Sequence, residues 1–155
     1  MTAFTKAQYI EEMVATRRKI HQMPEEGWTD IETSWLITER LRSLGLKPLL
    51  GLKVINPDAV MGRDPKLVAE AIERAKSHGV PQSFIDETEG YTGVVAVIDT
   101  GRPGPVTVFR ADMDCVVVSE SDSKDHVPTA CGFASKHPGF MHACGHDSHS
   151  PIALE

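Results

Sequence analysis

Residues 93–98 have the sequence GVVAVI, a short apolar run rich in β-branched residues. Such a run is typical of a buried strand, because branched side chains pack well on the pleated face of a sheet. The turn-forming sequence DTGRPGP follows at residues 99–105, and a second β-branched run, VTVF, occupies residues 106–109. We therefore predict a β-hairpin with a long connection over residues 93–109.

The second predicted strand leads directly into the sequence RADMD at residues 110–114. Asp112 and Asp114 are two residues apart, so on an extended chain both carboxylates point to the same side. The end of a strand is where enzymes built on a sheet commonly place their sites. A turn in which the aspartates cap their own backbone explains the pattern equally well.

Residues 141–149, with the sequence MHACGHDSH, place three histidines, a thiol and a carboxylate in one short segment. The thiol of Cys144 stands two residues before His146. Sulfur and imidazole nitrogen together favour a borderline transition metal over magnesium or calcium. Asp147 is the kind of carboxylate that orients a ligating imidazole. A solvated histidine-rich loop is the alternative, and the spacing favours a metal site over it.

Three helices are predicted before the hairpin, each from apolar residues that recur at helical spacing. The first begins with a capping box at Thr5 and ends before Pro24. The second ends at Gly45, because glycine suits the left-handed position that closes a helix. The third begins with Asp64 as its N-cap and Pro65 at its first position.

The histidine motif is flanked by two segments of different character. Residues 119–139 are polar and interrupted by proline and glycine, which predicts a long loop over the site. A short helix should follow the motif, with Ser150 as its N-cap and Pro151 at its first position. Cys115 and Cys131 are predicted to be small buried hydrophobes.

Size and charge limit the classes of protein to be considered. The chain has 155 residues, enough for one domain with a real core, and a net charge of -6. An acidic chain offers no basic face to nucleic acid, and no segment is long and apolar enough to cross a membrane. Three widely spaced cysteines do not form a disulfide framework and favour a reducing compartment. We also find no signal peptide and therefore expect a soluble, cytoplasmic protein.

Taken together, RADMD at 110–114 and MHACGHD at 141–147 resemble the M20 family of metal-dependent amidohydrolases. Supporting sequences are RKIHQMPE at 18–25, TGV at 92–94 and GRPGP at 101–105. The resemblance spans nearly the whole chain and is strongest to the branch that cleaves N-acyl amino acids, hippurate and auxin conjugates.

An insertion at about residues 53–89, together with the sequence GFAS at 132–135, narrows the resemblance to aminobenzoyl-glutamate hydrolases. The fold this implies is α/β: residues 1–155 would form the N-terminal part of a mixed-sheet, metallopeptidase-like catalytic domain. The smaller lid and dimerisation domain of the family would be absent.

The resemblance also implies a centre of two divalent ions, manganese or zinc. Cys144 and His146 match the family's first two metal ligands. Asp112 matches a carboxylate that supports the centre and is our candidate catalytic residue, with Asp114 its neighbour in the motif. His142 would lie near the site without being an assigned ligand. The remaining ligands and a glutamate general base would lie beyond this chain.

The implied reaction is hydrolysis of the amide bond of a small N-acyl amino acid, with p-aminobenzoyl-glutamate as the best candidate substrate. Hippurate or an acetyl amino acid is the alternative substrate. The whole enzyme should be a dimer or a hetero-oligomer with a second hydrolase subunit, with neither nucleic acid nor membrane as a partner. These 155 residues alone should be inactive and should associate through exposed apolar sheet edges.

Two other functions remain open. The chain could be a non-catalytic metal-binding or interaction fragment, or a thiol hydrolase with Cys144 as nucleophile and a histidine as base.

Some positions also depart from the family pattern. After the second aspartate the family usually has a small alanine and then leucine, and this chain has Cys115, Val116 and Val117 there. Serines at 148 and 150 stand where glycine and threonine are usual.

Overall fold

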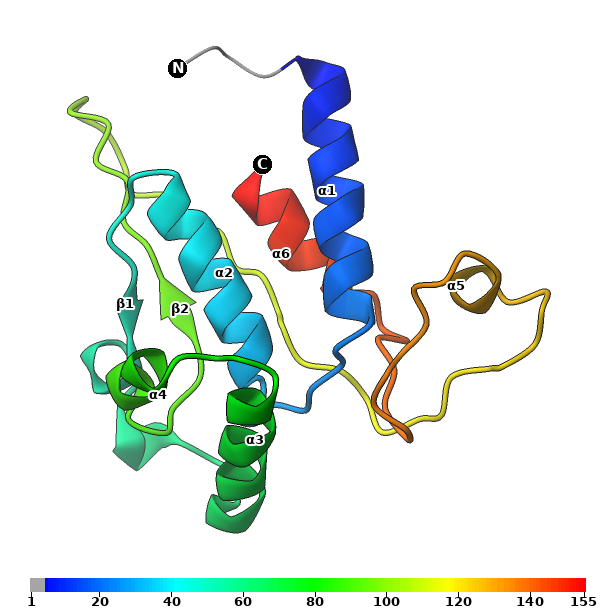
Figure 1. Cartoon of the computed structure of the whole chain (residues 1–155). Helices are drawn as coiled ribbons and strands as arrows, with labels where there is room; N and C mark the ends of the chain where they lie inside the picture. Colours follow the sequence, from blue (N-terminus) through cyan, green and yellow to red (C-terminus); the bar gives the residue numbers. More distant parts are fainter. Residues whose placement is uncertain (1–4) are drawn as a thin grey trace. The chain divides into compact units, whose positions relative to one another are not determined.

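The computed structural model describes residues 5–155, which divide into two compact units. One unit contains the described residues up to Glu26 together with Arg110–Glu155, and the other contains Gly27–Phe109. Figure 1 shows the elements in chain order. The helices are α1 (Lys6–His21), α2 (Ile31–Ser43), α3 (Pro65–Ser77), α4 (Gln82–Thr88), α5 (Val127–Ala130) and α6 (His146–Leu154), the 3-10 helices are η1 (Gly51–Lys53) and η2 (Pro57–Ala59), and the strands are β1 (Leu49–Leu50) and β2 (Val94–Val95).

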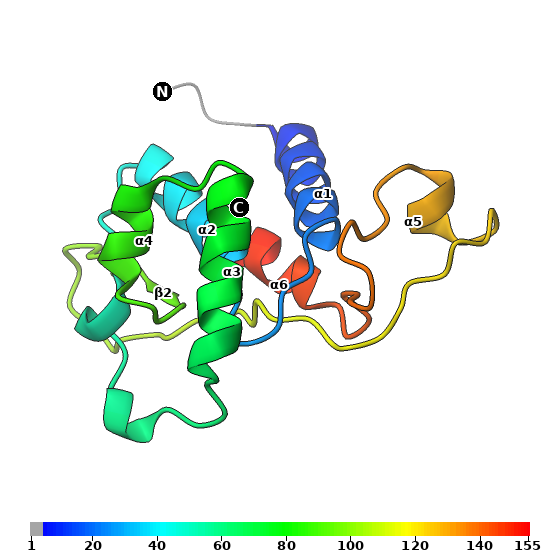
Figure 2. The same ribbon diagram turned by 60° about the horizontal axis from the view of Figure 1, so that its bottom comes forward.

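In the first unit, α1 and α6 pack side by side, as both Figure 1 and Figure 2 show. The predicted capping box of α1 is confirmed. Thr5 Oγ1 accepts a hydrogen bond from the Gln8 N–H at 3.3 Å, and the Gln8 side chain accepts one from the Thr5 N–H at 2.8 Å. The helix ends at His21, before Pro24, as expected. Ile20 and Leu154 are buried in this unit.

The start of α6 differs from the prediction. The helix begins at His146, after Gly145 in a left-handed conformation (φ 89°), so Pro151 lies inside the helix and Ser150 is not its N-cap. A proline there removes the hydrogen bond to the carbonyl of Asp147, four residues earlier. The helix forms nevertheless because tertiary packing, rather than local propensity, supplies most helical stability. Asp147, Ser150 and Pro151 are all buried.

In the second unit, α2, α3 and α4 enclose the main hydrophobic core. Two predicted helix ends are confirmed here: the Asp64 side chain accepts from the Lys66 N–H at 2.8 Å ahead of Pro65, and Gly45 has a φ of +81° just after α2. The helix α4 was not predicted. The core cluster consists of buried apolar side chains from several elements: Ile31, Leu50, Ala71, Ala75, Val80, Phe84 and Ile85.

The predicted hairpin is wrong. The first half, β2, is a strand, but its partner is β1, with Leu49 opposite Val95 and Leu50 opposite Val94 in antiparallel register. Among the described residues, 106–109 form no strand, and Val106 is 91% exposed. The β-branched residues at 106–109 do favour a strand, but a strand also needs a partner strand and a face that it can bury. A hairpin of two strands alone is only marginally stable.

The predicted long loop at 119–139 contains the short helix α5. Of the two cysteines expected to be buried, Cys115 is, and Cys131 is exposed. Burial, together with the carboxylates of Glu26 and Glu25, raises the pKa of the Cys115 thiol to about 12, so this thiol stays protonated at neutral pH. No helix among the described residues is long and apolar enough to cross a membrane.

Among the glycines of the second unit, Gly51 has the least room for a side chain. Its φ is +57°, and an added Cβ would lie 2.7 Å from the Thr88 carbonyl oxygen and 2.9 Å from that of Glu87. Gly51→Ala should therefore destabilise the chain by about 2–4 kcal/mol in urea unfolding. Gly45→Ala is the matched control and should cost about 1–2 kcal/mol, since among the described residues no atom beyond its chain neighbours lies within 4 Å of its Cβ position. Equal losses would contradict the steric argument.

Candidate metal centre

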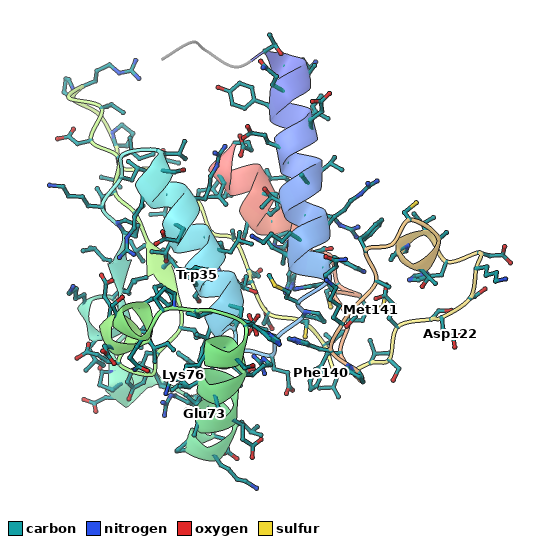
Figure 3. All side chains as sticks on the ribbon, in the orientation of Figure 1. Trp35, Glu73, Lys76, Asp122, Phe140 and Met141 are labelled. Atoms are coloured by element: carbon teal, nitrogen blue, oxygen red, sulfur yellow. The ribbon has the colours of Figure 1, made fainter. Side chains whose placement is uncertain are left out.

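The two aspartates of residues 110–114 and the histidine motif are brought together by a short antiparallel contact. The Val116 N–H donates to the Met141 carbonyl at 3.3 Å, and the Met141 N–H donates to the Val116 carbonyl at 3.2 Å. Figure 3 labels Met141 at the start of the motif. Gly145 then turns the chain into α6, so that His146 and His149 both lie in the first turn of the helix.

His146 is held by Asp114. Its Nδ1 lies 2.9 Å from Asp114 Oδ1 and 3.0 Å from the Asp114 backbone oxygen. Both partners are acceptors, so Nδ1 carries a proton, and Nε2 is the ring nitrogen left to bind a metal. A carboxylate that fixes the tautomer of a histidine in this way is typical of metal-ligating imidazoles. His146 is therefore oriented as a ligand, with Asp114 rather than Asp112 as its support.

Asp112 lies beside the second histidine of the helix. Its Oδ2 is 3.5 Å from His149 Nδ1, and its other oxygen forms an ion pair with the exposed Arg110 guanidinium. One ligand atom from each of Asp112, His146 and His149 can be chosen so that all three lie within 4.8 Å of one another. Two imidazoles and one carboxylate fit a divalent transition metal.

The remaining members of the predicted motif are placed differently. Cys144 is exposed, and the cluster of Asp112, His146 and His149 does not include it. His142 is only 3% exposed, and both of its ring nitrogens lack a hydrogen-bond partner among the described residues. Burial lowers the pKa of His142 to about 4, so this imidazole is neutral.

Asp147 was expected to orient a ligating imidazole, but it belongs instead to a buried ionic network whose other members the sequence patterns did not single out. Asp147, with 0% of its surface exposed, accepts hydrogen bonds from Arg17 Nε and from His21 Nδ1, both at 2.7 Å. The other ring nitrogen of His21 lies 2.9 Å from Glu120 Oε1. His21 thus bridges two carboxylates and must be protonated on both nitrogens to donate to both.

Glu120 is the far end of this network. It also contacts His126 Nε2 at 2.8 Å and accepts from the Ser135 backbone N–H. Burial alone would raise the pKa of Glu120, but these donors and His21 together lower it. Burial likewise lowers the pKa of His21, but its hydrogen bonds to Asp147 and Glu120 outweigh this and raise it above the ordinary value. His21 is 126 and 99 residues from its two partners, so no local pattern reveals them.

Curated relatives match nearly the whole chain, although no family model does. The chain is 42% identical over 94% of its length to a homolog of a p-aminobenzoyl-glutamate hydrolase subunit in Haemophilus influenzae. It is 44% identical over 89% to a p-aminobenzoyl-glutamate hydrolase subunit of Escherichia coli, and 41% identical over 95% to indole-3-acetyl-aspartic acid hydrolase of Enterobacter agglomerans. It spans only 34%, 32% and 34% of these proteins, respectively.

Two solved structures have the same fold over the aligned residues. An aminobenzoyl-glutamate utilization protein from Klebsiella pneumoniae aligns with 71% of this chain and 28% of its own, at 40% identity and a TM-score of 0.66. The YXEP protein of Bacillus subtilis, described as a dinuclear metal-binding peptidase of the M20 family, aligns with 97% of this chain and 30% of its own, at 27% identity and a TM-score of 0.61.

These similarities agree with the carboxylate-supported histidine site: the relatives are hydrolases by name, and one solved structure is described as a dinuclear metal-binding peptidase. The chain belongs to the M20 family. Within that family it is similar to p-aminobenzoyl-glutamate hydrolase subunits and their homologs at 42 and 44% identity, against 26% for an N-acetyldiaminopimelate deacetylase of Listeria monocytogenes. The predicted fold, part of an M20 catalytic domain, is confirmed, and the chain spans about a third of its relatives' length.

Proposed function

We propose that this chain is the part of an amidohydrolase that supplies ligands to its metal centre, and that the whole protein hydrolyses N-acyl amino acids. The first candidate substrate is p-aminobenzoyl-glutamate, which would yield p-aminobenzoate and glutamate. The observation that carries the proposal is His146, whose Nδ1 is held by Asp114 so that Nε2 is available to a metal, in a chain 44% identical to a hydrolase of that name.

The residues have separate roles in this proposal. His146 and Cys144 bind metal, Asp114 holds the His146 imidazole, and Asp112 supports the centre with its carboxylate. Two divalent ions, manganese or zinc, would lower the pKa of a water molecule and polarise the amide carbonyl. The general base is expected to be a glutamate outside this chain, so the chain alone should not turn over substrate.

The whole protein is proposed to work with a second hydrolase subunit, because two of its relatives are named as one subunit of such an enzyme or as its homolog. We place it in the cytoplasm, since all three cysteines are free. Among the described residues, no histidine hydrogen-bonds the Cys144 thiol, which argues against a thiol hydrolase, because that chemistry needs a base beside the nucleophile.

The test is hydrolysis of p-aminobenzoyl-glutamate by the full reading frame, with and without its partner subunit, in the presence of added manganese or zinc. Chelation should abolish activity, and Cys144→Ser should lower it strongly. Cys131→Ser is the matched control, because that thiol is exposed and outside the motif, and it should leave activity unchanged. Activity that resists chelators but is lost on alkylation would establish the thiol hydrolase instead. Metal binding without any hydrolysis would establish a non-catalytic role.

A further inference from the structure

A cluster of one arginine and two aromatic residues in the second unit has no part in the proposed metal centre. It consists of Trp28, Arg63 and Tyr91, and Arg63 belongs to the insertion at about residues 53–89. The guanidinium carbon of Arg63 lies 4.6 Å from the centroid of the Tyr91 ring. The Trp28 ring meets the Tyr91 ring edge to face, with centroids 6.4 Å apart and planes inclined by 88°. Trp28 also donates from Nε1 to the Met61 carbonyl at 2.9 Å, which ties the insertion to the segment before α2.

The Arg63 guanidinium is partly buried and pairs with no carboxylate among the described residues. Its Nε and Nη2 both donate to the Gly90 carbonyl, at 3.0 and 2.8 Å, and a carbonyl carries no net charge. Arg17 and Arg74 are also partly buried, and each forms an ion pair with a buried carboxylate. Three of the five N–H groups of Arg63, two on Nη1 and one on Nη2, therefore make no hydrogen bond within the described part of the chain. They form the planar fork that binds a carboxylate through two parallel hydrogen bonds.

The backbone at this cluster is strained. Two non-glycine residues of the described chain have a positive φ, Trp28 at 68° and Glu89 at 51°. Trp28 is a member of the cluster, and Glu89 directly precedes Gly90, whose carbonyl binds Arg63. The left-handed region is costly for residues with a bulky side chain, and such strain is concentrated at ligand clamps and active sites. The strain is thus a second observation, independent of the unpaired charge, that points to a ligand.

We propose that Trp28, Arg63 and Tyr91 form a binding site for a small aromatic carboxylate. The fork of Arg63 donates to both oxygens of the carboxylate, and the ring of the ligand packs against the Trp28 and Tyr91 rings, edge to face or as an offset stack. A carboxylate without a ring uses the fork alone, and a ring without a carboxylate uses the aromatic side chains alone, so we expect tight binding to need both parts. The site lies within the second unit and needs no metal ion, so it goes beyond the proposed hydrolysis and does not depend on it.

The test is a titration of the Trp35→Phe chain with benzoate in the presence of a chelator, followed by tryptophan fluorescence. Trp35, labelled on α2 in Figure 3, packs against the core cluster, and its replacement leaves Trp28 as the one tryptophan of the chain. Benzoate should bind saturably and at least about tenfold more tightly than acetate or benzyl alcohol, which supply the carboxylate or the ring alone. Arg63→Lys keeps the charge but loses the planar fork, and Tyr91→Leu loses the ring, so each should weaken benzoate binding at least about tenfold.

Arg102→Lys is the matched control, because Arg102 is an exposed arginine of the same unit outside the cluster, and this change should leave benzoate binding unaltered. Thermal unfolding followed by circular dichroism establishes that each variant is folded. Unchanged benzoate affinity in Arg63→Lys, or equal affinities for benzoate and benzyl alcohol, would overturn the inference. Absence of saturable benzoate binding by the folded Trp35→Phe chain would overturn it as well, and would leave Arg63 as a structural link between the insertion and Gly90. Because the chelator removes metal ions, hydrolysis by the full reading frame succeeds or fails separately from all of these results.

Discussion

Replacing His21 by glutamine should destabilise the chain by about 3–5 kcal/mol, the usual effect of removing one partner from a buried ionic pair. His21 is 1% exposed and lies between Asp147, at 2.7 Å, and Glu120, at 2.9 Å. Glutamine carries no charge and cannot donate to both carboxylates from opposite ends of a ring. Small domains have a total free energy of unfolding of about 5–15 kcal/mol, so this loss would remove a large fraction of the stability. Urea unfolding followed by circular dichroism measures the loss.

His78→Gln provides the matched control for this substitution. His78 also contacts a carboxylate, Glu32 Oε2 at 2.9 Å, but its side chain is 48% exposed. Contacts of partly solvated charged groups contribute little, so the loss should stay below about 1 kcal/mol. Similar losses at the two positions would show that the buried network is not a major source of stability.

The same network should make stability depend on pH. The pKa of His21 is raised above its ordinary value of 6.5, because its hydrogen bonds to Asp147 and Glu120 outweigh its burial. A raised pKa gives a stabilisation that is complete below 6.5 and is lost as pH rises through the folded-state value. The pKa of Glu120 is lowered from 4.5, so its contribution is present above that value and is lost as pH falls through the folded-state value.

The network should therefore contribute most at mildly acidic pH. The difference in melting temperature between the wild type and His21→Gln should be largest near pH 6 and smaller at about pH 9. Using a difference cancels the titration of groups common to both proteins, including His142, whose pKa burial lowers to about 4. A difference that stays constant or grows toward alkaline pH would contradict the assignment of a protonated His21.

The helix ends show how much of this fold the sequence could predict. Thr5, Asp64 and Gly45 were located correctly because capping depends on side chains and backbone within a few residues. Strand pairing and the start of α6 were predicted wrongly because both depend on contacts far along the chain. Residues 93–98 contain a real strand, but nothing in their pattern specifies Leu49 and Leu50 as its partner.

In the candidate site, too, local features could be predicted from the sequence and contacts between distant residues could not. His146 and the two aspartates could be found because the motif is compact and its residue types suit a metal. That Asp114, rather than Asp112, holds His146 was not predictable, because it depends on the pairing of Val116 with Met141. The roles of His21 and Glu120 were equally hidden, since a histidine in the last turn of a helix is usually explained by the helix dipole alone.

The isolated chain should also self-associate. The segment that follows β2 exposes its apolar side chains: Val97, Ile98, Val106, Val108 and Phe109 are 74%, 69%, 91%, 85% and 68% exposed. Figure 1 shows the chain after β2 rising as a loop past the end of α2 before it turns back. Extended, apolar and unpaired backbone is a template for strand addition from another molecule. Light scattering coupled to gel filtration should therefore find a mass above 17.0 kDa that rises with protein concentration.

Lysine on this segment should reverse the association. Charged side chains on an exposed edge oppose pairing with a second chain, so Val106→Lys combined with Val108→Lys should shift the chain to a monomer. Met61→Lys is the matched control: Met61 is an equally exposed apolar residue, at 83%, outside the segment, and changing it should leave association unaltered. If Met61→Lys dissociates the chain as well, general surface hydrophobicity rather than strand pairing is the cause. A wild-type chain that is monomeric at every concentration would refute the prediction, because so much exposed apolar surface would then be stable in water without a partner.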